Sequence, residues 1–122
     1  LKQWQDLVLE HGWAYGTGGH ALAGKRLLCA VTAGGRSAAY TAEGYNRLTV
    51  RQLLAPVENT ARLCRMEFLE PWVVHGSHRL ADPDIAEVAR AYGELLARLA
   101  DGRHDALAAS LAATLAPPAA LA

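Results

Sequence analysis

The stretch Lys25-Arg26-Leu27-Leu28-Cys29-Ala30-Val31-Thr32-Ala33-Gly34-Gly35 decides the fold of this chain. Its short apolar run, rich in Leu and Val, predicts a strand covered on both faces, as in a parallel sheet. The strand ends in a turn of small residues that offers a hydroxyl, two glycines and backbone N–H groups. Because ligands bind at the C-terminal edge of strands in open α/β sheets, this turn is the first candidate for a binding site.

The composition sets the class of protein. The 122 residues are enough for one small α/β domain, and a hydrophobic content of 52% excludes global disorder. Twelve basic residues balance twelve acidic ones, which argues against a nucleic-acid surface. No apolar run reaches the roughly 18 residues of a membrane span. We interpret Cys29 and Cys64, both in apolar segments, as buried free thiols of a protein in a reducing compartment.

Helical periodicity marks three segments. Residues 1–11 form the first, with an apolar stripe that predicts its buried face: Leu1, Trp4, Leu7, Val8 and His11. The second runs from an N-cap at Thr49 to about residue 66, and Pro56 is expected to kink or restart it. Its predicted buried side comprises Leu53, Leu54, Val57, Ala61 and Cys64. The third begins at an N-cap Asp82 with Pro83 in the first turn and ends at Ala100. Its apolar stripe comprises Ile85, Val88, Ala89, Tyr92, Leu95, Leu96 and Leu99.

A second strand is predicted over residues 67–75, with Pro71 restricting its first half to an edge position. Strands that alternate with helices favour a parallel sheet with right-handed crossovers. Two strands alone do not make a stable sheet, so further strands must come from residues absent here or from another chain. The chain also begins inside a helical pattern, and we therefore expect it to be part of something longer.

The glycine-rich loop from Trp13 to His20 precedes the first strand. Its glycines prevent regular structure and allow a close backbone approach. Two interpretations remain open: a surface loop that packs its aromatic side chains on the core, or a pocket wall that presents Trp13 and Tyr15 to a flat ligand. His20 is a candidate contact for a phosphate.

Several spaced motifs together carry a family resemblance. They are His11-Gly-Trp-Ala-Tyr-Gly-Thr-Gly-Gly-His20, Thr32-Ala33-Gly34-Gly35, Glu43-Gly44-Tyr45-Asn46-Arg47, and Glu70-Pro71-Trp72-Val73-Val74-His75. With these motifs the chain resembles the flavodoxin-like NAD(P)H:quinone oxidoreductases. Within them it is most similar to the bacterial ancillary proteins of glutathione-regulated potassium-efflux antiporters.

The resemblance implies a flavodoxin-like, three-layer α/β/α fold with a parallel sheet. The two strands of this chain would be the fourth and fifth of the order 2-1-3-4-5. Residues 1–100 would then form the C-terminal half of the fold. The Ala/Leu-rich tail, residues 101–122, is expected to be a weak helix or disordered.

The resemblance also implies roles for particular residues. The turn Thr32, Ala33, Gly34 and Gly35 would lie along a flavin ring, with Ala33 replacing the second threonine usual in the family. Tyr40 would lie near the pyrimidine end of that ring. Trp13, Tyr15 and Tyr45 would line the substrate site, with the wall formed by Trp13 and Tyr15 lying across a dimer interface. Tyr15 and Asn46 would be the catalytic positions, and Tyr45 and Asn46 fall where some relatives carry a catalytic histidine.

The function implied is two-electron hydride transfer from NAD(P)H through FMN, rather than FAD, to a quinone. The alternative is a regulatory ancillary subunit that activates a membrane potassium antiporter with little turnover of its own. Either protein would be a cytoplasmic homodimer, or one that lies on the inner face of the membrane. His75 and His78 lack an acidic or cysteine partner nearby in the sequence, so we predict no metal site there.

Overall fold

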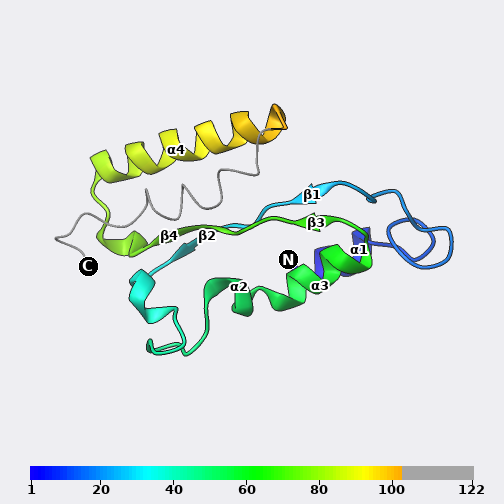
Figure 1. Cartoon of the computed structure of the whole chain (residues 1–122), viewed down its shortest axis with the longest axis horizontal. Coiled ribbons are helices and arrows are strands. Elements are labelled where there is room, and N and C mark those ends of the chain that lie inside the picture. The colour runs from blue at the N-terminus through cyan, green and yellow to red at the C-terminus, as the bar shows by residue number, and fades with distance from the viewer. Residues whose placement is uncertain (103–122) are drawn as a thin grey trace. The chain divides into compact units, whose positions relative to one another are not determined.

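The computed structural model describes residues 1–102, which form parts of two compact units (Figure 1). Residues 1–29 and 50–71 belong to the first unit, and residues 30–49 and 72–102 belong to the second. The predicted tail falls outside the described residues from position 103 on. No helix in the described part of the chain combines the length and apolar character needed to cross a membrane.

The first unit contains a short parallel pairing between β1 (Arg26–Leu27) and β3 (Glu67–Phe68). Arg26 pairs with Glu67, and Leu27 pairs with Phe68. The Glu67 N–H donates to the Lys25 carbonyl at 2.9 Å, and the Leu69 N–H donates to the Leu27 carbonyl at 3.0 Å. The predicted parallel direction of the two strands is therefore correct in this unit.

Helices α2 (Val50–Leu53) and α3 (Ala55–Leu63) replace the single predicted helix of residues 49–66. The break falls at Leu54, and Pro56 occupies the first turn of α3, where its missing N–H removes no helical bond. The predicted restart at this proline is thus confirmed. Ala61 and Cys64 are fully buried as expected, whereas Leu53 is exposed, contrary to its predicted position.

The C-terminal end of α3 is closed by its own backbone. The Met66 N–H bonds to the Ala61 carbonyl at 2.9 Å, and the Arg65 N–H bonds to the Arg62 carbonyl at 3.0 Å. This pattern is a Schellman motif, which requires a left-handed residue after the helix. Arg65 takes that conformation with φ of 59°, although glycine is the residue that adopts it without strain.

Helix α1 (Lys2–Val8) is shorter than the predicted 1–11 segment, because the chain leaves helical geometry at Leu9. Its predicted buried stripe is wrong for this chain: Leu1, Trp4 and Leu7 are 85%, 59% and 69% exposed. Gln5 is the half-buried residue of this helix instead. Periodicity identified the apolar face, but nothing in the described residues covers it.

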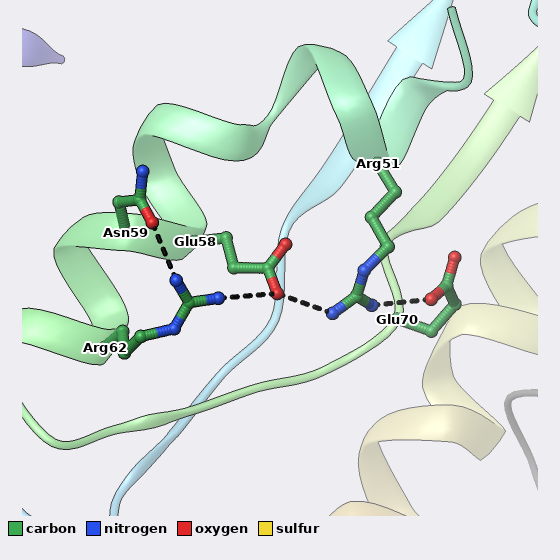
Figure 2. Close-up of polar contacts among 5 residues, drawn as sticks. All are labelled: Arg51, Glu58, Asn59, Arg62 and Glu70. Carbon is green, nitrogen blue, oxygen red and sulfur yellow. Dashed lines mark hydrogen bonds and ion pairs between the residues drawn. The ribbon is translucent and has the colours of Figure 1, made fainter.

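Arg51 on α2 contacts Glu58 on α3 and Glu70, which lies two residues after β3 (Figure 2). One guanidinium nitrogen lies 2.6 Å from Glu70 Oε2, and the other lies 3.0 Å from Glu58 Oε1. The guanidinium also lies 5.2 Å from the centre of the Phe68 ring, within range of a cation–π interaction. Arg62 extends the network by pairing with Glu58. These contacts hold the helices against the end of the strand.

The second unit is built on β2 (Ala30–Ala33) and β4 (Trp72–His75), again parallel. Along β2, exposed and half-buried residues alternate, so the prediction that both faces are covered is wrong for this chain. Trp72 is 6% exposed, and its ring centre lies 5.8 Å from that of Tyr92 on α4 (Asp82–Ala100). The core of this unit comprises Trp72, Ala91 and Leu95.

Helix α4 has the predicted bounds, but Ala81 rather than Asp82 is its N-cap. The carboxylate of Asp84, three residues after the cap, accepts the Ala81 N–H at 2.9 Å. This is the backward half of a capping box, and it explains why a cap without a side-chain acceptor is tolerated. Of the predicted stripe, Leu95 is buried, whereas Ile85 and Leu96 are 50% and 45% exposed.

Each predicted strand is therefore interrupted once. In the first predicted strand, two unpaired residues, Leu28 and Cys29, separate the two paired segments. In the second predicted strand, three residues, 69–71, separate them. The pairing register consequently differs by one residue between the two units. Pro71 lies in the longer stretch, where its missing N–H cannot contribute to a regular ladder, as its predicted edge position anticipates.

Candidate functional site

The candidate site of the second unit lies where β2 and β4 end. Ala33 and His75 are paired at the last position of this ladder, so both strands end at the same edge of the sheet. The turn Gly34–Gly35 follows β2, and Gly76 follows β4. The Gly76 N–H donates to the Gly35 carbonyl at 3.0 Å, which fastens the two loops to each other. This is the edge at which parallel sheets place their ligands.

Tyr40 packs directly on the glycine turn. It follows the 3-10 turn η1 (Ser37–Ala39), and its N–H donates to the Ser37 carbonyl at 2.9 Å. A Cβ atom on Gly35 would lie 3.1 Å from Tyr40 Cε2 and 3.4 Å from its hydroxyl. Gly35 does not have a positive φ. It is therefore the close approach of the tyrosine ring, rather than a special backbone conformation, that favours glycine here.

His75 forms the other side of this packing. Its ring centre lies 5.2 Å from that of Tyr40, with the two planes tilted by 46°. Burial lowers the pKa of His75, and hydrogen bonding with the backbone of Gly35 offsets part of this effect. His75 Nδ1 is buried without a hydrogen-bond partner in the described part of the structure. Burial therefore favours the neutral form of this imidazole, whose ring contacts Tyr40.

A second histidine lies beside the other glycine of the turn. His78 belongs to the 3-10 turn η2 (Ser77–Arg79), which begins after Gly76 in the left-handed conformation. A Cβ atom on Gly34 would lie 3.4 Å from His78 Nδ1. On the far side of the ring, Arg79 Nε donates to His78 Nε2 at 3.2 Å.

The remaining residues of the predicted turn differ in exposure. Thr32 is exposed and Ala33 is half-buried, because neighbouring residues of a strand face opposite sides. The Thr32 hydroxyl, the Tyr40 hydroxyl and the His78 imidazole thus give this edge side-chain donors next to an aromatic ring. Such a set fits a flat heterocycle with acceptor atoms along one edge. Among residues 1–102, no group of three or more His, Cys, Asp or Glu side chains is placed to hold a metal ion.

Tyr45 and Asn46 lie on the loop that follows η1. The Asn46 N–H donates to the Ala39 carbonyl at 2.9 Å, which holds this loop against the 3-10 turn. Gly44 is needed there, because a Cβ atom would lie 2.2 Å from the Ala38 carbonyl oxygen. Asn46 is half-buried, whereas Tyr45 is 93% exposed. The tyrosine is therefore presented to solvent from an anchored loop.

Trp13 and Tyr15 belong to the first unit, on the glycine-rich loop. The Gly12 N–H donates to the Tyr15 carbonyl at 2.8 Å, and the Tyr15 ring meets His11 edge-on at 5.6 Å. A Cβ atom on Gly19 would lie 2.0 Å from the Tyr15 carbonyl oxygen. The loop is thus tightly folded around Tyr15, while Trp13 is 47% exposed. Packing of both aromatic residues on the core, one of the two interpretations of this loop, is wrong for Trp13.

Sequence reasoning considered His75 and His78 only as a metal pair and missed their place at the turn. The signal was available in the predicted parallel pairing, because strands that run together also end together. The residues that follow the second strand then face the turn that follows the first. What spacing within one segment cannot show is which side chains meet across that edge.

A family described as having the flavodoxin-like fold matches residues 1–96. Among curated relatives, the glutathione-regulated potassium-efflux system ancillary protein KefG of Pectobacterium carotovorum is 45% identical over 97 residues. That match covers 80% of this chain and 53% of the relative. The chain spans about half the length of the curated relatives it matches.

Solved structures give the same picture of the fold. General stress protein 14 of Treponema denticola, solved in complex with FMN, is 38% identical with a TM-score of 0.68, covering 82% of this chain and 55% of that one. An NADPH-quinone reductase from P. pentosaceus is 31% identical with a TM-score of 0.68, covering 75% and 54%. A structure titled as a thermophilic tryptophan halogenase, from Streptomycin violaceusniger, is 40% identical with a TM-score of 0.73, covering 76% and 54%.

Proposed function

Because the chain belongs to the family with the flavodoxin-like fold, we propose that the whole protein is an FMN-dependent NAD(P)H:quinone oxidoreductase. Its similarity to KefG and to an NADPH-quinone reductase supports an oxidoreductase. The structure solved with FMN supports this flavin. Since the chain spans about half of its relatives, the activity is proposed for the complete protein.

The observation that carries the proposal is the packing of Tyr40 between Gly35 and His75 at the end of two parallel strands. A glycine turn lets a flat ring approach the backbone closely. The tyrosine hydroxyl and the turn supply donors for the polar edge of that ring. His75, half-buried and in ring contact with Tyr40, keeps the tyrosine ring in place.

The roles of the chain's residues follow from this arrangement. Thr32, Ala33, Gly34, Gly35 and Tyr40 would bind FMN, with the Thr32 hydroxyl at the exposed edge. Bound FMN would supply the hydride relay between nicotinamide and quinone.

The substrates would be bound by exposed aromatic residues. Trp13 and Tyr45 are exposed enough to stack on a flat substrate, and Tyr15 and Asn46 are the residues proposed to assist catalysis. In a homodimer, the loop carrying Trp13 and Tyr15 would line the site of the partner subunit.

Steady-state kinetics on the complete protein test the proposal. We expect FMN to be retained on gel filtration and to support NADH or NADPH oxidation by 1,4-benzoquinone. If the protein binds FMN but shows no turnover with either nucleotide, the proposed oxidoreductase activity is excluded.

Tyr40→Phe tests the site itself by removing one hydroxyl. Loss of one hydrogen bond of about 0.5–1.5 kcal/mol predicts a roughly two- to tenfold weaker affinity for FMN. Tyr92→Phe is the matched control, because it removes the same hydroxyl group from a tyrosine on α4, where the ring packs on Trp72. Equal FMN affinities of the two variants would exclude Tyr40 as a ligand.

The relationship to KefG favours a second candidate. The protein would then be an ancillary subunit of a potassium-efflux system, cytoplasmic or bound to the inner face of the membrane. Potassium efflux from cells that carry the antiporter, with and without this protein, tests that role. Efflux that depends on the protein but not on its turnover would support the ancillary role over the enzyme.

A further inference from the structure

We infer that His78 is a further binding residue of the turn, and that Arg79 positions it by fixing its tautomer. The inference rests on the proposed function, since the ligand in question is FMN. It assigns a donor to a residue for which the sequence predicted no metal site and no other role.

The tautomer follows from one hydrogen bond. A guanidinium has N–H donors and no acceptor, so the 3.2 Å bond from Arg79 Nε to His78 Nε2 requires Nε2 to be the acceptor. A neutral imidazole with an accepting Nε2 carries its proton on Nδ1. The nitrogen that the arginine does not contact is therefore a donor.

That donor lies at the glycine turn. A Cβ atom on Gly34 would lie 3.4 Å from His78 Nδ1, an ordinary contact distance, so this nitrogen faces the open side of Gly34. The Tyr40 hydroxyl has the same relation to Gly35, at 3.4 Å. The turn is thus flanked by two side-chain donors, one beside each glycine.

The loop that carries His78 is held in place by its backbone. Gly76, with φ of 64°, bonds through its N–H to the Gly35 carbonyl at 3.0 Å, and the Arg79 N–H bonds to the Gly76 carbonyl at 2.8 Å. His78 and Arg79 are both exposed, so an acceptor atom can reach the imidazole without displacing core residues. A flat ring laid along the turn would offer such an acceptor on its polar edge.

The first test does not depend on flavin. Two-dimensional ¹H–¹⁵N spectra of the histidine ring nitrogens should show the Nδ1–H tautomer for His78 in the wild type. In Arg79→Met, which removes the donor to Nε2, the population of this tautomer should fall, whereas Arg90→Met, an equal charge change on α4, should leave it unchanged. A His78 that carries its proton on Nε2 in the wild type would overturn the inference.

The second test measures FMN affinity of the complete protein by quenching of flavin fluorescence. One lost hydrogen bond predicts that His78→Leu binds FMN roughly two- to tenfold more weakly, and that His78→Gln, which retains an N–H donor, recovers part of the loss. Arg79→Met should weaken binding less than His78→Leu. If the wild type binds FMN and His78→Leu binds it equally well, the inference fails while the proposed function stands. If the wild type does not bind FMN, both fail, whatever the tautomer.

Discussion

Arg51 provides the sharpest stability prediction, because one side chain makes three separate contacts. Replacing it with methionine keeps an unbranched apolar side chain but removes both ion pairs, to Glu70 at 2.6 Å and to Glu58 at 3.0 Å. It also removes the cation over the Phe68 ring. The variant therefore tests whether this network stabilises the first unit.

The magnitude follows from the exposure of the partners. The side chain of Arg51 is 37% exposed, and those of Glu58 and Glu70 are 25% and 50% exposed, so solvent screens both pairs. Each pair should contribute about 0.3–1 kcal/mol. The cation–π contact should add about 0.5–1 kcal/mol. We expect Arg51→Met to lower the free energy of unfolding by about 1–3 kcal/mol.

Urea unfolding of the wild type, Arg51→Met, Glu70→Gln and the double variant measures this contribution. A coupling free energy of about 0.5–1 kcal/mol between Arg51 and Glu70 is expected. It should shrink in about 1 M salt, where the screening length falls to roughly 3 Å. Arg90→Met is the control, because Arg90 pairs with Glu94 on the exposed face of α4.

Two results would refute this reasoning. One is an Arg51→Met variant as stable as Arg90→Met, within about 0.5 kcal/mol, the usual range for surface substitutions. The other is a coupling free energy of zero at low salt, which would mean that the ion pair to Glu70 does not contribute to stability.

Three further predictions concern single residues. Gly35→Ala should lower the free energy of unfolding by about 1–3 kcal/mol, because the added methyl group is pushed against Tyr40. Gly34→Ala meets only an ordinary contact and should leave the stability nearly unchanged. Thermal unfolding of the two variants checks this difference. Arg65→Gly should raise the free energy of unfolding by about 0.5–1 kcal/mol, because glycine adopts the positive φ of this position without strain. An unchanged or lower urea midpoint would contradict this prediction. Burial lowers the pKa of His75 below 6.5, so the unfolded chain binds the proton more tightly. The free energy of unfolding should therefore fall as pH drops below 6.5, down to the lowered pKa, and His75→Phe should lose that part of the pH dependence.

Much of the local structure was predictable from short-range patterns. The bounds of α4, the restart of the helix at Pro56 and the parallel sense of the strands all agree with the expectations. The flavodoxin-like fold implied by the motifs is confirmed by the family match. Each of these features depends on periodicity, a proline or the order of elements within a limited stretch of chain.

Burial was predicted less well. Trp4 and Leu7 were expected in a core, and Ile85 on a packed helix face, yet all three are exposed in this chain. Periodicity tells which residues share a face of a helix, but burial depends on what lies opposite that face. Among residues 1–102, these faces are left largely uncovered.

The sequence by itself determined where helices and strands occur along this protein and the glycine turn after β2, because helix periods, caps and turn residues act over a few positions. Only the tertiary structure decided the register of the strands, the packing of Tyr40 against His75, and the position of His78 beside Gly34. These features join residues some 35 to 45 positions apart. Their contacts depend on where the two parallel strands end together, and the conformational preferences of neighbouring residues do not specify that position.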